Sequence, residues 1–281
     1  MLSSIKAIYL ATATGGCFLF FWSGSLFLSW VLLPLVRLSM RGRSEIDKVH
    51  ACQDVIGIGF RLFLGTMRWT RTLVFHPSRA VLAPPEGPCV IIANHPTLID
   101  VTAIMAVHPR VCCVAKDALF RSIMVGPLLR QCGHINGGGD SLTSGASVIL
   151  QATERLEQGQ SVLIFPEGTR SPAHGLRRFR PGAFEICRRA GVPALPILIS
   201  CNPPTLLKGL AWYALPRQTA RYEMRQLPTL TNETLAGDSH QTARDIQALF
   251  QEHGNTLADA SATGSPDASI PLAEDANHAR S

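Results

Sequence analysis

The longest hydrophobic stretch of the chain comes first, because residues 7–36 contain no charged side chain. A helix needs about 20 apolar residues to cross a bilayer, so this run is long enough for a tilted transmembrane helix. Internal glycines and Pro34 leave a second interpretation open, in which the run breaks into a re-entrant pair of helices. A cleaved signal peptide is a third, although its apolar region usually has only about 7–15 residues. We interpret the run as a membrane anchor.

The charges that flank this run predict its orientation. Lys6 alone precedes it, whereas four basic residues follow it, namely Arg37, Arg41, Arg43 and Lys48. Because basic residues stay on the cytoplasmic side, we expect everything after the anchor to lie on the cytoplasmic face of the inner cell membrane.

Residues 54–75 have a different pattern, in which polar positions repeat at helical spacing. Asp54, Arg61, Arg68 and Thr72 fall on one narrow stripe, and bulky apolar residues fill much of the rest. An amphipathic helix of this kind is typical of the bilayer interface. The alternative is a helix packed against the following domain. Either arrangement would hold that domain close to the membrane.

From residue 89 the pattern alternates between short apolar runs and helical stretches. Four short runs predict buried strands, at 89–93, 111–115, 161–165 and 193–199. Four longer stretches predict the helices between them, at 98–107, 118–130, 142–157 and 182–190. This alternation indicates an α/β domain, with a largely parallel or mixed sheet flanked by helices. The order of the strands does not follow from the pattern.

The C-terminal part of the chain is less regular. We expect a strand near 221–227 and an amphipathic helix at 239–253. Residues 254–281 have no periodicity, and their Ala, Ser, Asp and Pro content is typical of disorder. The predicted organisation is therefore an anchor at 1–75, a globular domain at 76–253 and a disordered tail at 254–281.

Composition agrees with membrane contact. Charged residues make up 16% of the chain, against roughly 25% in an ordinary soluble domain, and the net charge is +6. Only four of the 26 basic residues are lysines, and arginine favours phosphate and carboxylate partners. The eight cysteines form no CxxC pair and sit in apolar runs, which predicts buried thiols in a reducing compartment. No motif for nucleic-acid binding accompanies the basic charge.

The first cluster of reactive residues follows the predicted strand at 89–93. In open α/β sheets the carboxyl ends of strands are where ligands bind. Asn94 and His95 lie at this position, and Asp100 comes five residues after the histidine. A carboxylate at this spacing can reach the imidazole and make it a general base for a hydroxyl. Alternatively, Thr97 and Asp100 form a variant capping box that only closes the helix.

A second polar turn, with the sequence F-P-E-G-T-R-S at 165–171, follows the predicted strand at 161–165. Glu167 offers a hydrogen-bond acceptor, Gly168 permits close backbone approach, and Arg170 offers a bidentate donor. Three more arginines follow at 177, 178 and 180, which favours a phosphate or carboxylate ligand. A solvated basic loop with a local ion pair is the alternative.

A glycine run at 137–139 is the third candidate, because its N–H groups could face an anion. It matches neither a P-loop nor G-x-G-x-x-G, and a flexible connection is the simpler interpretation. The chain has no G-x-S-x-G elbow, which argues against a serine acyl-enzyme, and no H-E-x-x-H metal motif.

Together these blocks resemble the glycerolipid acyltransferase family typified by 1-acylglycerol-3-phosphate acyltransferase. The resemblance rests on N-H-P-T-L-I-D at 94–100, F-P-E-G-T-R-S at 165–171 and V-P-A-L-P-I at 192–197, in the order of the family. It implies a membrane-bound O-acyltransferase of phospholipid biosynthesis. His95, oriented by Asp100, would deprotonate an acceptor hydroxyl, which attacks the thioester of acyl-CoA or acyl-carrier protein without a covalent acyl-enzyme.

The resemblance also implies which residues bind the substrate and which partners the protein has. Glu167, Gly168, Thr169 and Arg170 match the block that binds the glycerol phosphate of the acceptor, and Asn94, beside the catalytic pair, is a further expected substrate-binding residue. The expected partners are membrane lipids and the acyl carrier, with no nucleic acid. No cofactor or metal is implied, since acyl-CoA or acyl-carrier protein is a substrate.

One departure from the family pattern concerns the acceptor. The family usually has an arginine shortly after its G-x-I segment, whereas Asn136 and three glycines follow Ile135 here. Lysophosphatidate and another lipid hydroxyl therefore both stay open as acceptors, with Arg177, Arg178 or Arg180 as sources of the missing charge. Two other function classes also stay open: a thioester or lipid hydrolase, and a membrane-tethered module that binds lipid or acyl-carrier protein without catalysis.

Overall fold

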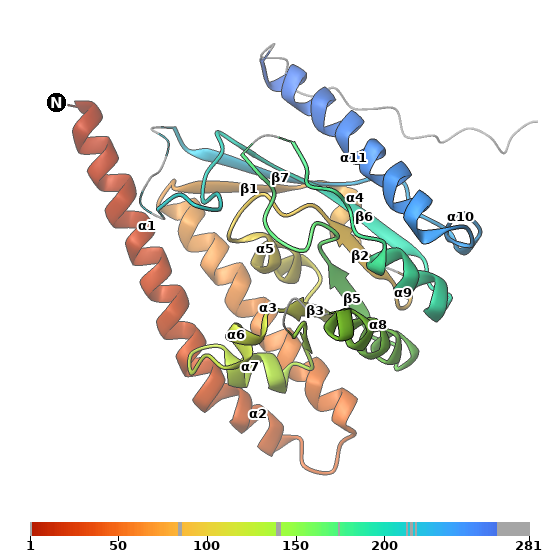
Figure 1. The fold of residues 1–281 in the computed structure, drawn as a ribbon. Coiled ribbons are helices and arrows are strands. Elements are labelled where there is room, and N and C mark those ends of the chain that lie inside the picture. The colour runs from red at the N-terminus through yellow and green to blue at the C-terminus, as the bar shows by residue number, and fades with distance from the viewer. Residues whose placement is uncertain are drawn as a thin grey trace, which may run out of the picture.

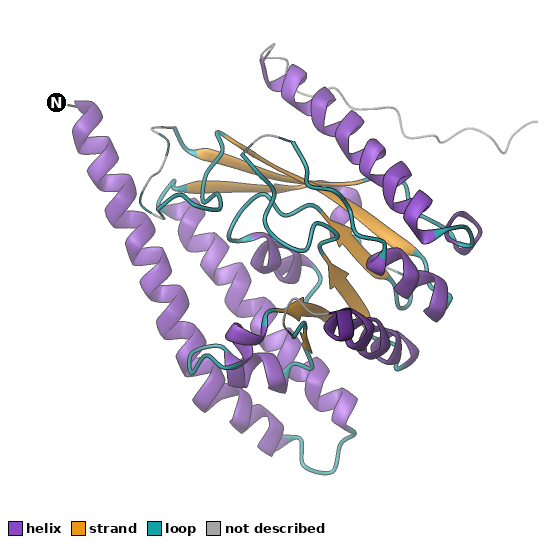
Figure 2. Ribbon diagram, viewed as in Figure 1, coloured by secondary structure: helices purple, strands orange, loops and turns teal. Residues whose placement is uncertain are grey.

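The computed structural model describes residues 2–83, 86–138, 142–173, 175–211, 213, 216 and 218–262. A twisted seven-stranded sheet lies at its centre, with helices on both faces and a long N-terminal helix along one side (Figures 1 and 2). The predicted fold class, a mixed sheet flanked by helices and preceded by an apolar helix, is confirmed.

The order of the strands places the polar turns at one edge of the sheet. The order is β1-β7-β6-β2-β5-β3-β4, and only the β6–β7 pair is antiparallel. The carboxyl ends of β2, β5, β3 and β4 therefore share an edge. The strands are β1 Leu73–Pro77, β2 Val90–Ala93, β3 Val111–Ala115, β4 Ile135–Asn136, β5 Ser161–Ile164, β6 Ala194–Asn202 and β7 Ala220–Gln226.

Alternation along the strands builds two hydrophobic layers. In β2, Ile91 faces the layer formed with α3 (Glu45–Trp69) and α5 (Asp100–Val107). Its neighbour Ile92 faces the layer formed with α8 (Leu142–Glu157), α9 (Gly182–Ala190) and α11 (Ser239–Ala262). Both strand residues are fully buried. This two-sided burial explains why the strands read as continuous apolar runs.

The short helices are α4 Arg79–Leu82, α6 Asp117–Phe120, α7 Gly126–Gln131 and α10 Asn232–Leu235.

The N-terminal apolar run forms one continuous helical segment rather than a re-entrant pair. Helix α1 (Leu2–Phe27) passes through a π-helical turn, Leu28–Leu32, into α2 (Leu33–Ser39). Pro34 explains the wider turn, since it lacks an N–H and its ring crowds the carbonyl one turn earlier. Residues 6–39 are long and apolar enough to cross a membrane, and most of their surface is exposed.

Helix α3 packs against the globular domain, as the alternative interpretation of residues 54–75 expects. Its buried face includes Ile56, Phe63 and Met67. Two members of the polar stripe also turn towards the domain: Asp54 pairs with Arg110 at 2.8 Å, and Arg61 donates to the Ala106 carbonyl at 3.0 Å. The helix therefore ties the N-terminal segment to the sheet.

Four elements differ clearly from the sequence prediction. The edge strand β1 begins at residue 73, inside the predicted anchor, and pairs with β7, so no helical pattern could reveal it. Strand β4 has only two residues and lies outside every predicted strand. The predicted helix at 118–130 is broken between α6 and α7, where Pro127 starts a new helix. Helix α11 continues to Ala262, so the predicted tail begins too early; the helix crosses Gly254 into an alanine-rich stretch. Residues 263–281 of that tail lie outside the described residues.

Candidate active site

His95 and Asp100 meet in the turn between β2 and α5. The His95 Nδ1 and Asp100 Oδ2 atoms are 2.7 Å apart. A carboxylate only accepts, so Nδ1 carries the proton and Nε2 keeps its lone pair. The Asp100 side chain is fully buried, whereas 18% of the His95 side chain is exposed. The histidine can thus reach a substrate while its partner stays shielded from water.

The buried carboxylate of Asp100 accepts four hydrogen bonds. Oδ2 accepts from His95 Nδ1 and from the Thr97 N–H, the latter at 2.7 Å. Oδ1 accepts from the Thr97 hydroxyl at 2.5 Å and from the Tyr222 hydroxyl at 2.8 Å. Asp100 therefore closes the turn before α5, although no side chain among the described residues caps the N-terminus of that helix, and it also orients the imidazole. One side chain serves both purposes.

The turn after β5 is fastened directly to the histidine. The Phe165 ring stacks on the His95 ring, with centroids 4.2 Å apart and planes 23° apart. Glu167 is buried, and its Oε1 accepts from the His95 N–H at 3.1 Å and from the Ser171 hydroxyl at 2.6 Å. Its Oε2 accepts from the Arg177 N–H at 2.8 Å. Glu167 therefore acts as an internal support in this structure.

Cationic side chains surround the exposed turn at Gly168. Its φ of +68° suits glycine, and a Cβ there would lie 3.0 Å from the Arg180 guanidinium carbon. Lys208 donates to the Thr169 hydroxyl at 3.0 Å, and Arg170 donates to the Leu206 carbonyl at 3.3 Å. We call Arg170, Arg180 and Lys208 the cationic cluster.

The ends of β3 and β4 are joined by a hydrogen-bond network around Asn136. The Asn136 amide donates to Asp117 Oδ1 at 3.0 Å, and its oxygen accepts from the Gly138 N–H at 2.9 Å. Asp117 also pairs with Arg121 at 2.7 Å. Asn136 is thus occupied in holding the glycine run, of which Gly139 lies outside the described residues. Asn136 itself brings no positive charge, and the cation bonded into this network, Arg121, is paired with Asp117.

The predicted site residues come together, but in different roles. His95, Asp100 and Glu167 form one bonded unit, and Gly168, Thr169 and Arg170 form the exposed turn beside it. Asn94 is buried, and its side-chain amide exchanges two hydrogen bonds with the Ile199 backbone, at 2.8 and 2.7 Å. It joins β2 to β6 and thereby positions the residue that follows.

Sequence reasoning missed three members of this unit. Phe165 was placed in a strand and in the F-P-E-G-T-R-S turn without a role of its own, Tyr222 lies 122 residues from the aspartate that it contacts, and Lys208 lies 39 residues from Thr169. Only the position of Tyr222 within the expected strand at 221–227 offered a signal. Neither its partner nor its side of the sheet followed from that pattern.

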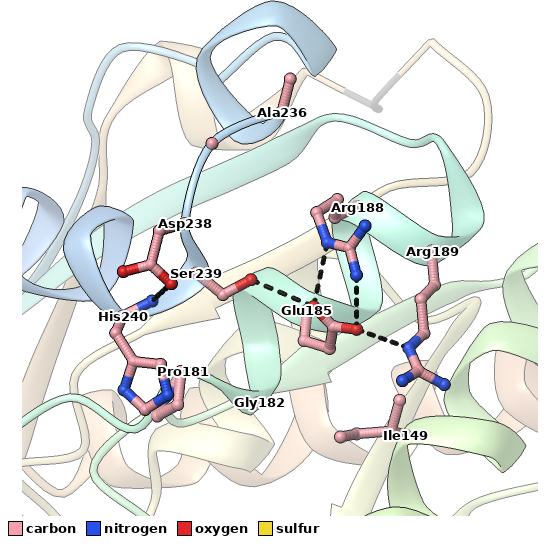
Figure 3. A pocket seen from close by; sticks show the side chains of 11 residues that line it. Ile149, Pro181, Gly182, Glu185, Arg188, Arg189, Ala236, Asp238, Ser239 and His240 are labelled. Carbon is pink, nitrogen blue, oxygen red and sulfur yellow. Dashed lines mark hydrogen bonds and ion pairs between the residues drawn. The ribbon is translucent and has the colours of Figure 1, made fainter.

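A polar cleft of about 570 Å³ lies elsewhere, between α8, α9 and the start of α11 (Figure 3). Glu185 stands between Arg188 at 2.8 Å and Arg189 at 2.6 Å, and it accepts from Ser239 at 3.1 Å. These donors lower the pKa of Glu185 to about 2. The cleft shares no lining residue with the His95 unit.

Other ionisable groups in the core are held neutral. Burial lowers the pKa of His134 to about 4, and it raises the pKa of Cys113 and Cys187 to about 12. All eight cysteines are free, and all except Cys201 are buried. Among the described residues no three His, Cys, Asp or Glu side chains form a metal-binding group.

Comparisons with known proteins agree with this geometry. Residues 77–200 match the family model described as Acyltransferase. The mouse 1-acyl-sn-glycerol-3-phosphate acyltransferase alpha is 31% identical over 171 residues, covering 59% of this chain and 56% of the relative. The Escherichia coli 1-acyl-sn-glycerol-3-phosphate acyltransferase is 34% identical over 116 residues, covering 41% and 47%. The chain thus spans about half the length of these curated relatives.

A solved structure shares the fold over nearly the whole chain. It is the 1-acyl-sn-glycerophosphate acyltransferase PlsC from Thermotoga maritima, with a TM-score of 0.70 and 16% identity, covering 91% of this chain and 98% of that one. The matched segment contains both the His95–Asp100 pair and the Gly168 turn. Residues 77–200 are therefore similar to the acyltransferase family, and the curated relatives that match them are named 1-acyl-sn-glycerol-3-phosphate acyltransferases.

Proposed function

We propose that the protein is a membrane-bound O-acyltransferase, which moves a fatty acyl group from a thioester to the hydroxyl of a lysophospholipid such as 1-acylglycerol-3-phosphate. The observation that carries this proposal is the His95–Asp100 pair, with an accessible imidazole next to the cationic cluster. The related curated enzymes, which carry the same activity in their names, support it.

The geometry supports a direct transfer. Asp100 holds the Nδ1 proton, so His95 Nε2 is free to take the proton of the acceptor hydroxyl. The oxygen then attacks the thioester carbonyl and forms the new C–O bond, and the C–S bond breaks. The departing thiolate takes the proton from the imidazolium, which leaves an ester, a free thiol and the neutral histidine. The ring of Phe165 shields one face of the imidazole throughout.

We further propose that the cationic cluster binds the acceptor phosphate. Arg170 belongs to the Gly168 turn, Lys208 reaches the turn from a later segment, and the Arg180 guanidinium lies against Gly168 itself. Guanidinium and ammonium groups are the usual protein partners of phosphate. Asn136 is uncharged and bonds to Asp117, whose carboxylate also pairs with Arg121, so we assign the phosphate to the cluster rather than to the β4 end. A head group without phosphate is the second candidate, and the absence of a cation at Asn136 favours it.

The N-terminal segment supports membrane attachment. Large apolar side chains are exposed along α1, and an apolar cleft of about 600 Å³ opens between its end and the loop carrying Ile123. Tyr9 donates to the Thr70 carbonyl at 3.1 Å, and Trp30 donates to the Ile123 carbonyl at 2.9 Å. Residues 9 and 30 are roughly 30 Å apart along a helix, about the thickness of a bilayer core. Both ends of this stretch bond to the same domain, so the helix runs alongside the domain rather than away from it. We therefore propose that α1 lies in the cytoplasmic leaflet beside the domain.

The proposal is tested with purified protein in lipid micelles, using labelled acyl-CoA and labelled acyl-carrier protein as donors. Each donor is offered lysophosphatidate, phosphate-free 1-acylglycerol or no acceptor. Labelled phosphatidate, formed only in the presence of lysophosphatidate, is the expected product. Transfer only to 1-acylglycerol would keep the reaction and replace the acceptor. Release of free fatty acid at the same rate without any acceptor would identify a hydrolase instead.

Membrane attachment has its own test. The variant Leu19→Glu places a charge on the exposed face of α1, where 72% of the Leu19 side chain is accessible, and should weaken sedimentation with anionic lipid vesicles. Leu10 on the same helix is buried, so it is not a suitable comparison; Glu252→Gln on α11 serves as the control. Equal sedimentation of wild type and Leu19→Glu would contradict lipid contact at this face.

A further inference from the structure

A buried tyrosine donates a hydrogen bond to the candidate catalytic aspartate. Tyr222, on β7, has no exposed surface, and its hydroxyl lies 2.8 Å from Asp100 Oδ1. The contact joins two elements that are far apart in sequence.

The apolar surroundings of Tyr222 do not need its hydroxyl. The ring packs against Phe75 with centroids 5.8 Å apart, and it belongs to the same core cluster as Ile99 and Met224. A phenylalanine would fill this space equally well. Burying a hydroxyl costs free energy unless it finds a partner, and the partner here is the carboxylate.

The hydroxyl is a permanent donor. Burial and the negative charge of Asp100 raise the pKa of Tyr222 well above 10, so the phenol keeps its proton at every pH at which the enzyme could work. Each donor to a carboxylate stabilises its charged form and reduces the negative charge felt by the other partners. Tyr222 and His95 bind different oxygens of the same carboxylate and therefore compete for one charge.

We propose that Tyr222 is a positioning residue of the acyltransferase, which holds Asp100 in place and restrains the basicity of His95 through it. The inference rests on the proposed function for its catalytic meaning, but the coupling itself is a property of the protein without substrate. Two other titratable groups face this pair, namely Glu167, which bonds the His95 N–H, and Cys201. Burial raises the pKa of Cys201 to about 12, so its thiol stays neutral.

The direction of the effect follows from the charge. Without the Tyr222 hydroxyl, more of the negative charge of Asp100 acts on the imidazole, and the protonated ring is stabilised. The midpoint of the imidazole titration should then move to higher pH, by about half a unit. The variant Tyr222→Phe makes this change and leaves the ring in place.

The test is an NMR titration of ¹³Cε1-labelled histidines in the full-length protein in detergent. The His95 signal is identified by its loss in His95→Gln. We expect an upward shift of the midpoint in Tyr222→Phe and the wild-type midpoint in Tyr9→Phe, which removes a tyrosine hydroxyl from the anchor instead. A midpoint in Tyr222→Phe that is unchanged or lower overturns the inference. Thermal unfolding verifies that both variants are folded.

A second measurement keeps the hydroxyl. Replacing the tyrosines with 3-fluorotyrosine makes the phenol a stronger donor, so the midpoint should move to lower pH. A shift in the same direction as for Tyr222→Phe would overturn the charge argument. In wild type and Tyr222→Phe, the acidic limb of kcat/KM should follow the two midpoints, with about threefold lower activity of the variant on that limb and little change on the plateau. Wild type without any acyl transfer would refute the proposed function, and the titration would still decide the inference.

Discussion

Two polar regions of the molecule differ in how their charges are held. In the cleft of Figure 3, Glu185 is paired with Arg188 and Arg189 of its own helix, three and four residues further on. Around His95, the bonds come from the turn after β5, from α5 and from β7, up to 122 residues away in sequence. The cleft is a hollow of about 570 Å³, but its charges neutralise one another locally.

The difference teaches where to look for chemistry. Ion pairs within one helix are available to any helix with suitable spacing and contribute little to stability. A buried carboxylate with four donors requires several strand ends to converge, and it leaves the His95 side chain partly exposed at that point. Convergence of distant segments on one exposed basic atom therefore identifies the site better than the size of a cavity does.

Asp100→Asn gives the sharpest test of this comparison. The amide cannot hold the Nδ1 proton with the same charge, so the imidazole loses its fixed tautomer and the stabilisation of its protonated form. We expect kcat to fall by about 10³- to 10⁴-fold, as for other carboxylate–histidine pairs. The rate of acyl transfer at saturating substrates measures it. Less than a tenfold loss would mean that Asp100 serves only to hold the turn before α5.

Glu167→Gln and Glu185→Gln compare the two regions directly. Glu167 is buried and accepts three hydrogen bonds. In Glu167→Gln the side-chain NH2 group would face one of these donors and could not accept its hydrogen bond. We therefore expect the variant to lose about 2–3 kcal/mol of stability and to have a lower kcat. Glu185→Gln should cost less than about 1 kcal/mol and leave the kinetics unchanged. Chemical denaturation and steady-state rates measure both. Equal losses of stability in the two variants would contradict the contrast.

Lys208→Gln tests the acceptor assignment. Removing one ammonium from the cationic cluster should raise KM for lysophosphatidate about tenfold and leave KM for 1-acylglycerol unchanged. Lys48→Gln, on α3 and paired with Glu45, is the matched control. If both acceptors respond alike, Lys208 contributes to the surface charge but not to phosphate binding.

The smallest expected effect is the contribution of Glu185 to stability at acidic pH. The pKa of Glu185 is lowered from 4.5 to about 2 by Arg188, Arg189 and Ser239. A lowered pKa contributes stability that is complete above pH 4.5 and is lost as the pH falls towards 2. The partly exposed pairs limit this to below about 1 kcal/mol. The difference in unfolding free energy between wild type and Glu185→Gln should therefore shrink across this range, as measured by urea denaturation.

The sequence predicted the parts of the site that are local and missed those that are not. The spacing of His95 and Asp100 lies within one turn, and the Gly168 turn directly follows a strand, so both could be placed from the printed residues. The contact of Tyr222 with Asp100 depends on β7 lying next to β6, and strand order does not follow from periodicity. Asn94 was assigned to substrate because a polar residue beside a histidine suggests function. Only its bonds to Ile199 give it a place in the sheet.

The same distinction applies to the fold. Long apolar runs gave β2, β3, β5 and most of β6, and two predicted helices, 142–157 and 182–190, have the observed bounds. Strands β1 and β4 were missed because one continues a helical pattern and the other has two residues. Both exist only because a neighbouring strand supplies their hydrogen bonds.

The central claim is that His95 activates the acceptor hydroxyl for direct attack on the thioester. The most direct measurement is thiol release from labelled acyl-CoA, with and without lysophosphatidate, for wild type and His95→Ala. The account predicts rapid thiol release only when wild-type protein and acceptor are both present, with no label left on the denatured protein. Release of one equivalent of thiol without acceptor, with the acyl label bound to the protein, would contradict it.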